Sequence, residues 1–166
     1  MNAIEPKHGG DLSDFSIRKM TLDDLEQVVA IDKMSFSLPW PERSFRFELT
    51  DNETARCWVA ELDGRVAAMV VGWMIVDELH VATIATHPDY RGRGIGKRLL
   101  QHTLHAAKLE GAVRSFLEVR ESNMVARAMY LSFGYVEDGR RKEYYKDNNE
   151  DAILMTLENL DHLQGV

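Results

Sequence analysis

Apolar residues recur along the chain with two kinds of spacing, which predict strands and helices. Alternating or β-branched apolar runs predict strands at residues 15–20, 56–62, 65–76, 79–86, 114–120, 135–145 and 151–157. Three- and four-residue spacing predicts helices at residues 21–34, 41–49, 95–108 and 123–133. Because the elements follow the order βααβββαβαββ, we expect an α/β (α+β) fold with a mixed central sheet of about seven strands and helices on both faces.

Turn and cap residues support several of these boundaries. Asp63-Gly64 joins two strand-like runs and is a strong β-hairpin signal. Thr21 offers an N-cap for the first helix, and Gly134 suits the C-cap of the last. Pro39 and Pro41 fix φ and therefore predict a stiff loop between the first two helices.

The segment from Leu79 to Lys108 has the strongest pattern. A β-branched strand ends near Pro88, and an amphipathic helix begins at Ile95. Three glycines at alternate positions lie between them, and without Cβ atoms they let a ligand approach the backbone. The free N–H groups and the dipole of the helix favour an anion there. The residues that supply these features are Arg91, Gly92, Arg93, Gly94, Gly96, Lys97 and Arg98. A tight loop with a solvated basic surface is the alternative.

Two common phosphate-binding motifs do not fit this loop. A P-loop needs a glycine five positions before Gly96 and Ser or Thr after the lysine, but Arg91 and Arg98 occupy those places. The dinucleotide fingerprint also fails, because Lys97 stands where its third glycine belongs.

Length and composition indicate one soluble domain. The chain of 166 residues suits a single domain at residues 15–160, with a flexible N-terminal tail at 1–14 and a short C-terminal tail at 161–166. No apolar stretch approaches the ~20 residues of a membrane span, so we expect no membrane partner. The single cysteine, Cys57, argues against a disulfide framework and fits a cytoplasmic location.

Charge and histidine spacing restrict the ligand classes. The six histidines show no metal-ligand spacing with carboxylates or with the cysteine, so we expect no metal. The net charge of −7 argues against nucleic acid and favours a basic partner.

Three polar residues near the fifth predicted strand are candidates for chemistry. Glu118 interrupts an apolar run, where a carboxylate is costly unless it is paired or faces a cleft. Tyr130 lies twelve residues later at helical spacing, and Asn123 precedes that helix. The alternatives are an ion pair for Glu118, core packing for Tyr130 and a helix cap for Asn123. The possible ion-pair partners of Glu118 are Arg114, Arg120 and Arg127.

The loop before the long helix resembles that of a known enzyme family. Arg91, Gly94 and Gly96 match the R/Q-x-x-G-x-G/A pattern of the GNAT superfamily of N-acetyltransferases, and the resemblance extends from about residue 15 to 157. It implies the GNAT fold, in which the strands at 79–86 and 114–120 splay apart to admit the pantetheine arm of acetyl-coenzyme A. It also implies that the loop holds the pyrophosphate on backbone N–H groups. The cofactor-binding residues implied are Ile84, Ala85, Thr86, Arg91, Gly92, Arg93, Gly94, Ile95, Gly96, Lys97, Asn123 and Tyr130.

Further segments resemble the RimI-like branch, which acetylates protein N-termini and whose namesake acts on the N-terminal alanine of a ribosomal protein. These segments are 117–123, 128–135, Pro39-Trp40 with Phe45 and Leu49, and 140–155. The resemblance implies direct attack by an amine on the thioester, with Glu118 as general base through a water molecule and Tyr130 as general acid. Trp40, Glu118, Tyr144 and Tyr145 would contact the substrate, although edge packing is the alternative for the three aromatic residues.

Acid–base chemistry is consistent with an α-amine acceptor. A peptide α-amine has a pKa of ~8, whereas a lysine side chain has ~10.4 and needs more help to lose its proton. Together with the resemblance to the RimI-like branch, this leads us to expect the N-terminal peptide of a protein as partner, with Ala or Ser first, and a basic ribosomal protein is one candidate. Transfer to a lysine or to a small-molecule amine, and a non-catalytic acyl-coenzyme A-binding subunit, are the alternatives. We expect a monomer or a weak homodimer.

Overall fold

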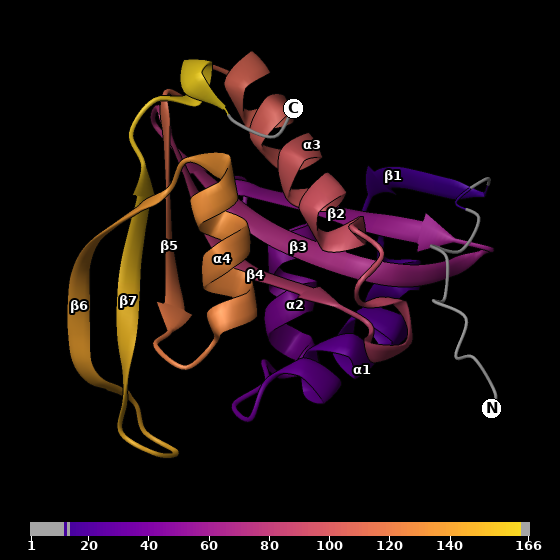
Figure 1. The fold of residues 1–166 in the computed structure, drawn as a ribbon. Coiled ribbons are helices and arrows are strands. Elements are labelled where there is room, and N and C mark those ends of the chain that lie inside the picture. Colours follow the sequence, from indigo (N-terminus) through magenta and orange to yellow (C-terminus); the bar gives the residue numbers. More distant parts are fainter. Residues whose placement is uncertain (1–11, 13, 164–166) are drawn as a thin grey trace, which may run out of the picture.

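The computed structural model describes residues 12 and 14–163, and a seven-stranded sheet forms its centre. The expected tails, 1–14 and 161–166, lie mostly outside the described residues. The strands are β1 (Phe15–Lys19), β2 (Ala55–Leu62), β3 (Arg65–Ile75), β4 (Glu78–Thr86), β5 (Arg114–Arg120), β6 (Val136–Tyr145) and β7 (Glu150–Leu157). They lie in the order β1-β2-β3-β4-β5-β7-β6 (Figure 1). The expected mixed sheet and element order are therefore confirmed.

Four α-helices cover the two faces of this sheet (Figure 1). They are α1 (Leu25–Ser35), α2 (Glu42–Thr50), α3 (Ile95–Leu109) and α4 (Met124–Phe133). Three short 3₁₀ turns accompany them, at Leu22–Asp24, Pro88–Tyr90 and Leu160–His162. Among the described residues, no helix is long and apolar enough to span a bilayer.

Two hydrophobic clusters, one on each face, fix the helices to the sheet. Leu99, Leu100 and Leu104 of α3 pack with Phe133 of α4 on one face. Residues of α1 and α2, including Phe45, pack with β2 and β3 on the other face. Each of the buried leucines stabilises the fold by roughly 1.5–3 kcal/mol. The amphipathic pattern thus determines which side of each helix meets the sheet.

The first helix begins later than the sequence indicates. The expected N-cap, Thr21, precedes a 3₁₀ turn at Leu22–Asp24, and α1 starts only at Leu25. The carboxylate of Asp24 accepts the Thr21 N–H at 2.8 Å and pairs with Arg18 at 2.8 Å. Because these bonds hold Asp24 against β1, the chain forms a tight turn before it forms the helix.

The expected turn residues adopt the conformations that their chemistry favours. Asp63 and Gly64 have φ values of 52° and 76°, as a two-residue hairpin with two left-handed positions requires. Gly134 ends α4 with φ 102°, so the predicted C-cap is confirmed.

β4 and β5 form the only parallel strand pair among the described residues, and they separate part-way along. Their pairing runs from Glu78↔Arg114 to Val81↔Leu117 and then stops, although both strands continue. The register with β3 shifts at the same level, so that Ala82 is an extra residue in β4. Such a bulge bends a strand away from its neighbour. The expected splay between these two strands is therefore present (Figure 1).

Candidate active site

Two cavities meet at the gap between the separated ends of β4 and β5. The first, with a volume of 360 Å³, lies between α1, α4 and the two strands, and we call it the α4 cavity. The second, with a volume of 730 Å³, extends toward β6 and β7, and we call it the β6 cavity. Both are lined by Trp40, Val81, Ala82, Leu117, Glu118 and Tyr145. A ligand in one cavity can therefore reach a ligand in the other through the gap.

The unpaired part of β4 offers backbone groups to the α4 cavity. Beyond Val81, one edge of β4 pairs with β3 while the other has no pairing with β5. The Ile84 side chain lines the cavity, but Ala85 packs into the core beside α1 and α2. Thr86 lies against the start of α3. Of these three predicted residues, only Ile84 lines the α4 cavity, and Thr86 lies instead beside the glycine loop.

Each glycine of the loop and of the first turn of α3 has its own structural reason. Gly92 and Gly94 adopt left-handed φ values of 77° and 76°, with open space around the position of a Cβ atom. Gly96 lies so close to β4 that a Cβ would come within 2.9 Å of Thr86 Oγ1. Gly94 is the N-cap of α3, so the N–H groups of the next residues have no acceptor within the helix. The loop therefore presents bare amides at the end of the splayed strand.

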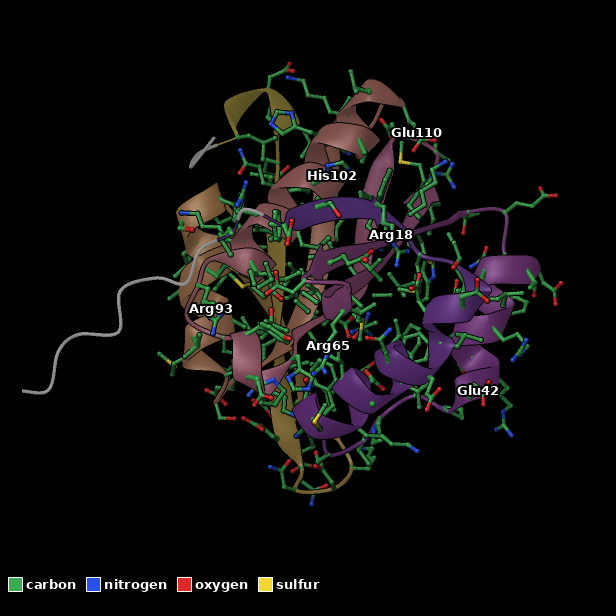
Figure 2. The ribbon with its side chains drawn as sticks, turned by 90° about the vertical axis from the view of Figure 1, so that its right-hand side faces the viewer. Arg18, Glu42, Arg65, Arg93, His102 and Glu110 are labelled. Atoms are coloured by element: carbon green, nitrogen blue, oxygen red, sulfur yellow. The ribbon has the colours of Figure 1, made fainter. Side chains whose placement is uncertain are left out.

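The basic residues of this loop contact neighbouring groups. Arg91 donates from Nε to the Thr86 carbonyl at 3.1 Å and from Nη2 to Ser35 Oγ at 3.2 Å. Arg93 lies over the Tyr90 ring at 5.6 Å and is exposed at the surface (Figure 2). The Lys97 ammonium lies 5.9 Å from the centre of the Phe133 ring. Arg91 thus joins the loop to β4 and α1, while Arg93 remains accessible to solvent.

Glu118 faces the gap and is paired with a residue that the sequence analysis did not single out as its partner. Its Oε1 accepts a hydrogen bond from Arg141 Nε of β6 at 2.8 Å. The Glu118 side chain is 32% exposed and lines both cavities. None of the three arginines considered as partners pairs with it, because they pair elsewhere. Arg114 pairs with Glu78, Arg120 with Asp147 and Glu150, and Arg127 with Glu137.

Tyr130 is both a buried residue and part of the cavity wall. It is 6% exposed, packs 5.8 Å from the Tyr135 ring, and lines the α4 cavity. Burial, with a smaller contribution from the charge of Tyr145, raises the pKa of the Tyr130 phenol above its ordinary value. The phenol therefore stays protonated at neutral pH and can act as a proton donor.

The two tyrosines at the end of β6 line the gap differently. Tyr145 borders both cavities, with the Arg120 guanidinium 3.9 Å from its ring centre, and burial raises its pKa to about 12. Tyr144 borders only the β6 cavity and packs edge-on against Tyr145 at 5.1 Å. β6 loses register with β7 between Arg141 and Tyr145, and Glu143 there has φ 52°. This irregularity brings both rings to the cavity side of the sheet edge.

Trp40 is held at the border of both cavities by a buried carboxylate that sequence reasoning missed. The Trp40 N–H donates to Asp32 Oδ2 at 2.7 Å, and its ring packs against Phe45 at 5.2 Å. Asp32 is 0% exposed, and burial raises the pKa of its carboxyl. In the sequence, Asp32 follows Ile31 within a helical pattern and carries no sign that a loop will cover it.

Arg120 links the two loops that flank the gap. Its Nη2 donates to Asp147 Oδ1 at 3.0 Å in the β6–β7 hairpin and to Ser37 Oγ at 3.1 Å in the loop after α1. Ser37 also donates to Asp147.

Asn123 lines the α4 cavity while its Oδ1 caps α4 by accepting the Ala126 N–H at 3.2 Å. Asn123 therefore both caps α4 and forms part of the cavity wall.

No cluster of three or more potential metal ligands occurs within the part of the chain that the structure describes. The walls of the two cavities combine free backbone groups of β4 with carboxylates and phenols, namely those of Asp32, Glu118, Asp138, Tyr130, Tyr144 and Tyr145.

Comparison with known proteins relates this site to acetyl transfer. Residues 25–135 match the model of the acetyltransferase (GNAT) family. A Bacillus subtilis protein is 39% identical over 140 residues, which span 84% of this chain and 93% of that protein. The [ribosomal protein bS18]-alanine N-acetyltransferase of Escherichia coli is 33% identical over 153 residues, which span 86% of this chain and 96% of the relative. The crystal structure of the ribosomal-protein-S18-alanine N-acetyltransferase from Escherichia coli superposes with a TM-score of 0.80 at 32% identity, covering 86% of this chain and 92% of that one.

Proposed function

Because the chain belongs to the GNAT family of acetyltransferases, we propose that it transfers the acetyl group of acetyl-coenzyme A to the N-terminal α-amine of a protein. The observation that carries this proposal is the meeting of the two cavities at one gap, where Glu118 and Tyr130 both line the wall. A donor and an acceptor can then approach from opposite sides, with a base and an acid between them.

The residues of the α4 cavity fit acetyl-coenzyme A. The pantetheine arm is an extended chain with amide groups, and the unpaired edge of β4 offers it backbone partners. The pyrophosphate is anionic and suits the bare amides and the dipole at the start of α3. Arg93 and Lys97 add positive charge beside that position.

Bound acetyl-coenzyme A supplies an acetyl thioester, at which the amine forms a C–N bond while the C–S bond breaks and sulfur takes the electron pair. Glu118 accepts the proton that the attacking amine loses, through a water molecule. Tyr130, which is protonated at neutral pH, donates its proton to the leaving sulfur, and the phenolate then regains a proton from solvent. Because a thiol has a pKa near ~8.5 and a phenol near ~10, this transfer is uphill by itself and is coupled to cleavage of the thioester and formation of the amide. Neither role needs a covalent intermediate on the protein.

The β6 cavity suits the end of a peptide. Trp40, Tyr144 and Tyr145 provide aromatic walls, and the acidic groups of Glu118 and Asp138 also line it. The Escherichia coli relative is named for the N-terminal alanine of a ribosomal protein. We therefore infer a small first residue, Ala or Ser, followed by a basic segment that suits the net charge of −7.

Mass spectrometry of acetylated peptides tests this function. The protein is incubated with acetyl-coenzyme A and peptides that begin with Ala, Ser or a large residue, each with and without an internal lysine. N-terminally blocked versions of the same peptides report on lysine acetylation alone. We expect one acetyl group on the α-amine of the Ala and Ser peptides. Acetylation confined to lysine, or none on any peptide, would contradict the proposal.

A further inference from the structure

One buried carboxylate oxygen at the α4 cavity has no partner. Asp32 lies near the end of α1, is 0% exposed and lines the cavity. Its Oδ2 accepts the Trp40 N–H at 2.7 Å. Its Oδ1 is buried and has no hydrogen-bond donor among the residues that the structure describes. One oxygen of this carboxylate is therefore hydrogen-bonded within the protein, and the other has no donor.

An unused oxygen of this kind is costly. A buried acceptor without a donor loses its hydration and gains nothing in return. Asp32 also lies in the last turn of α1, where the helix dipole adds negative potential. Both effects favour a ligand that brings an N–H group, and they favour a cationic one most.

The other polar groups of the cavity do not supply this donor. Arg120 is engaged with Asp147, Glu150 and Ser37, and Ser35 donates its hydroxyl proton to the Ile31 carbonyl. Glu118 is an acceptor that is already paired with Arg141. No described residue donates to Oδ1, so a molecule that enters the cavity can supply the missing donor.

We propose that Oδ1 of Asp32 accepts a hydrogen bond from the reacting amine of the acceptor peptide. This inference rests on the proposed function and names the group that recognises the amine. An α-ammonium has three N–H bonds. In the overall reaction one proton ends on sulfur, a second passes to solvent, and the third N–H remains in the product amide. Asp32 holds this remaining N–H, which turns the nitrogen lone pair away from Asp32 and toward the thioester.

The acceptor rather than the cofactor is the source of this N–H. In the proposed function, the amides of the pantetheine arm would find backbone partners along the unpaired edge of β4. Asp32, in contrast, is bonded to Trp40, which also borders the β6 cavity where the peptide is expected. Asp32 itself lines only the α4 cavity, but Trp40 places it beside the shared border, so an amine that passes from the β6 cavity through the gap can reach Oδ1.

A comparison of two peptides on two proteins isolates this contact. The first peptide begins with alanine, and the second is its des-amino analogue, in which hydrogen replaces the α-amino group. Binding of each is measured by calorimetry in the presence of coenzyme A, which cannot react. The variant Asp32→Asn keeps an oxygen for the Trp40 N–H but presents an NH₂ donor where Oδ1 was.

We expect the unmodified protein to bind the amino peptide roughly 10- to 100-fold more tightly than the des-amino peptide, as for a hydrogen bond to a charged group. In Asp32→Asn this preference should fall to about 2-fold or less, while the affinity for coenzyme A stays within about 2-fold. Steady-state kinetics of Asp32→Asn with acetyl-coenzyme A should show a raised KM for the amino peptide, together with a smaller change in kcat.

Asp24→Asn is the matched control. Asp24 is a second buried carboxylate, just before α1, but it is bonded to Arg18 and Thr21 and lines neither cavity. Its loss should lower thermal stability and leave the peptide preference unchanged. Asp32→Asn should behave in the opposite way. Because burial raises the pKa of Asp32, its ionised form opposes folding at neutral pH, and the neutral amide removes that penalty.

Three results would overturn the inference in different ways. If Asp32→Asn kept the full preference for the amino peptide, Asp32 would serve only to anchor Trp40. If it lost affinity for coenzyme A alone, the N–H would belong to the cofactor. If the unmodified protein bound the amino and des-amino peptides with equal affinity, the α-amino group would not be recognised at this position. Failure of the proposed function looks different, because then the unmodified protein would bind neither peptide.

Discussion

Arg141 Nε lies 2.8 Å from Glu118 Oε1, across the intervening strand β7. Arg141 projects from β6 and Glu118 from β5, and both line the β6 cavity. The pair is partly exposed, so it contributes little to the stability of the fold. Its significance is positional, since it holds Oε1 of a carboxylate that lines both cavities.

Replacement of this carboxylate tests its role as the base. Glu118→Gln keeps the shape of the side chain and removes its ability to take a proton. We expect kcat to fall roughly 100- to 10,000-fold, with the affinity for coenzyme A unchanged. Glu121→Gln, at the end of the same strand and paired with Arg140 outside both cavities, is the control and should keep kcat. A fully active Glu118→Gln protein would remove Glu118 from the mechanism.

The phenol of Tyr130 is tested by the loss of one oxygen atom. Tyr130→Phe deletes the proton donor and changes little volume in a buried site. We expect turnover to fall by about 100-fold or more while coenzyme A binding, measured by calorimetry, stays nearly intact. Tyr135→Phe is the control for stability, because its hydroxyl donates to Ser115 Oγ at 2.7 Å away from the cavities. Unchanged turnover in Tyr130→Phe would show that another group protonates sulfur.

The glycine loop is tested by adding charge and bulk to it. Gly94→Glu places a carboxylate beside the expected pyrophosphate and strains a left-handed position. We expect coenzyme A affinity to fall roughly 100-fold or more. Gly111→Glu is closely matched, because Gly111 also has positive φ and open space but lies beyond the other end of α3. It should bind normally. Equal losses in both variants would mean that backbone strain, and not the ligand, explains the effect.

Direct attack by the amine predicts that the only cysteine is dispensable. Burial, and to a smaller degree the charge of Glu48, raises the pKa of the Cys57 thiol to about 12. It is therefore a poor nucleophile at neutral pH. Cys57→Ala should keep kcat within about 2-fold. The intact mass of the unmodified protein, after acetyl-coenzyme A is added without acceptor, should show no acetyl group. An acetylated Cys57 that disappears when amine is added would establish a covalent route instead.

The link between the flanking loops should depend on pH. A bond from Ser37 holds the pKa of Asp147 below its ordinary value, and bonds from Ser122 do the same for Glu150, with Arg120 contributing to both. A carboxyl whose pKa is lowered by folding stabilises the fold above its ordinary pKa, near 4. This stabilisation is lost as the pH falls through the lower, folded-state value.

Arg120→Gln should therefore reduce the loss of thermal stability between pH 5 and pH 3, as followed by circular dichroism. If Arg120→Gln kept the pH dependence of the unmodified protein, the carboxylates of the hairpin would be stabilised without the arginine.

Local chemistry was enough to predict most element boundaries but not their irregularities. Asp63-Gly64 and Gly134 each require a particular backbone conformation, so their turns follow from residue type. The bulge at Ala82 has no such signal, because the residues around it form one continuous β-branched run. The gap between β4 and β5 was expected only from the family resemblance, and the bulge supplies its physical cause.

The contacts of the site were harder to predict than its members. Glu118 and Tyr130 line the cavity wall, but the partner of Glu118 is 23 residues away and two strands across. Only the strand order β5-β7-β6 brings Arg141 within reach of it. Asp32 shows the same limit. Its helical pattern is ordinary, and its burial depends on the return of the chain at Trp40.

Among the described residues, four residue pairs between β4 and β5 are the only strand pairing that joins the antiparallel half-sheet β1–β4 to the half-sheet formed by β5, β7 and β6. The pairing between β4 and β5 is therefore incomplete at the place where the acyl donor is expected to lie. A molecule that hydrogen-bonds along the free edge of β4 and also contacts β5 replaces the missing backbone partners and connects the two half-sheets. A cosubstrate bound there, as proposed, would be a structural component for as long as it stays bound, and its departure would return the two half-sheets to their weaker junction.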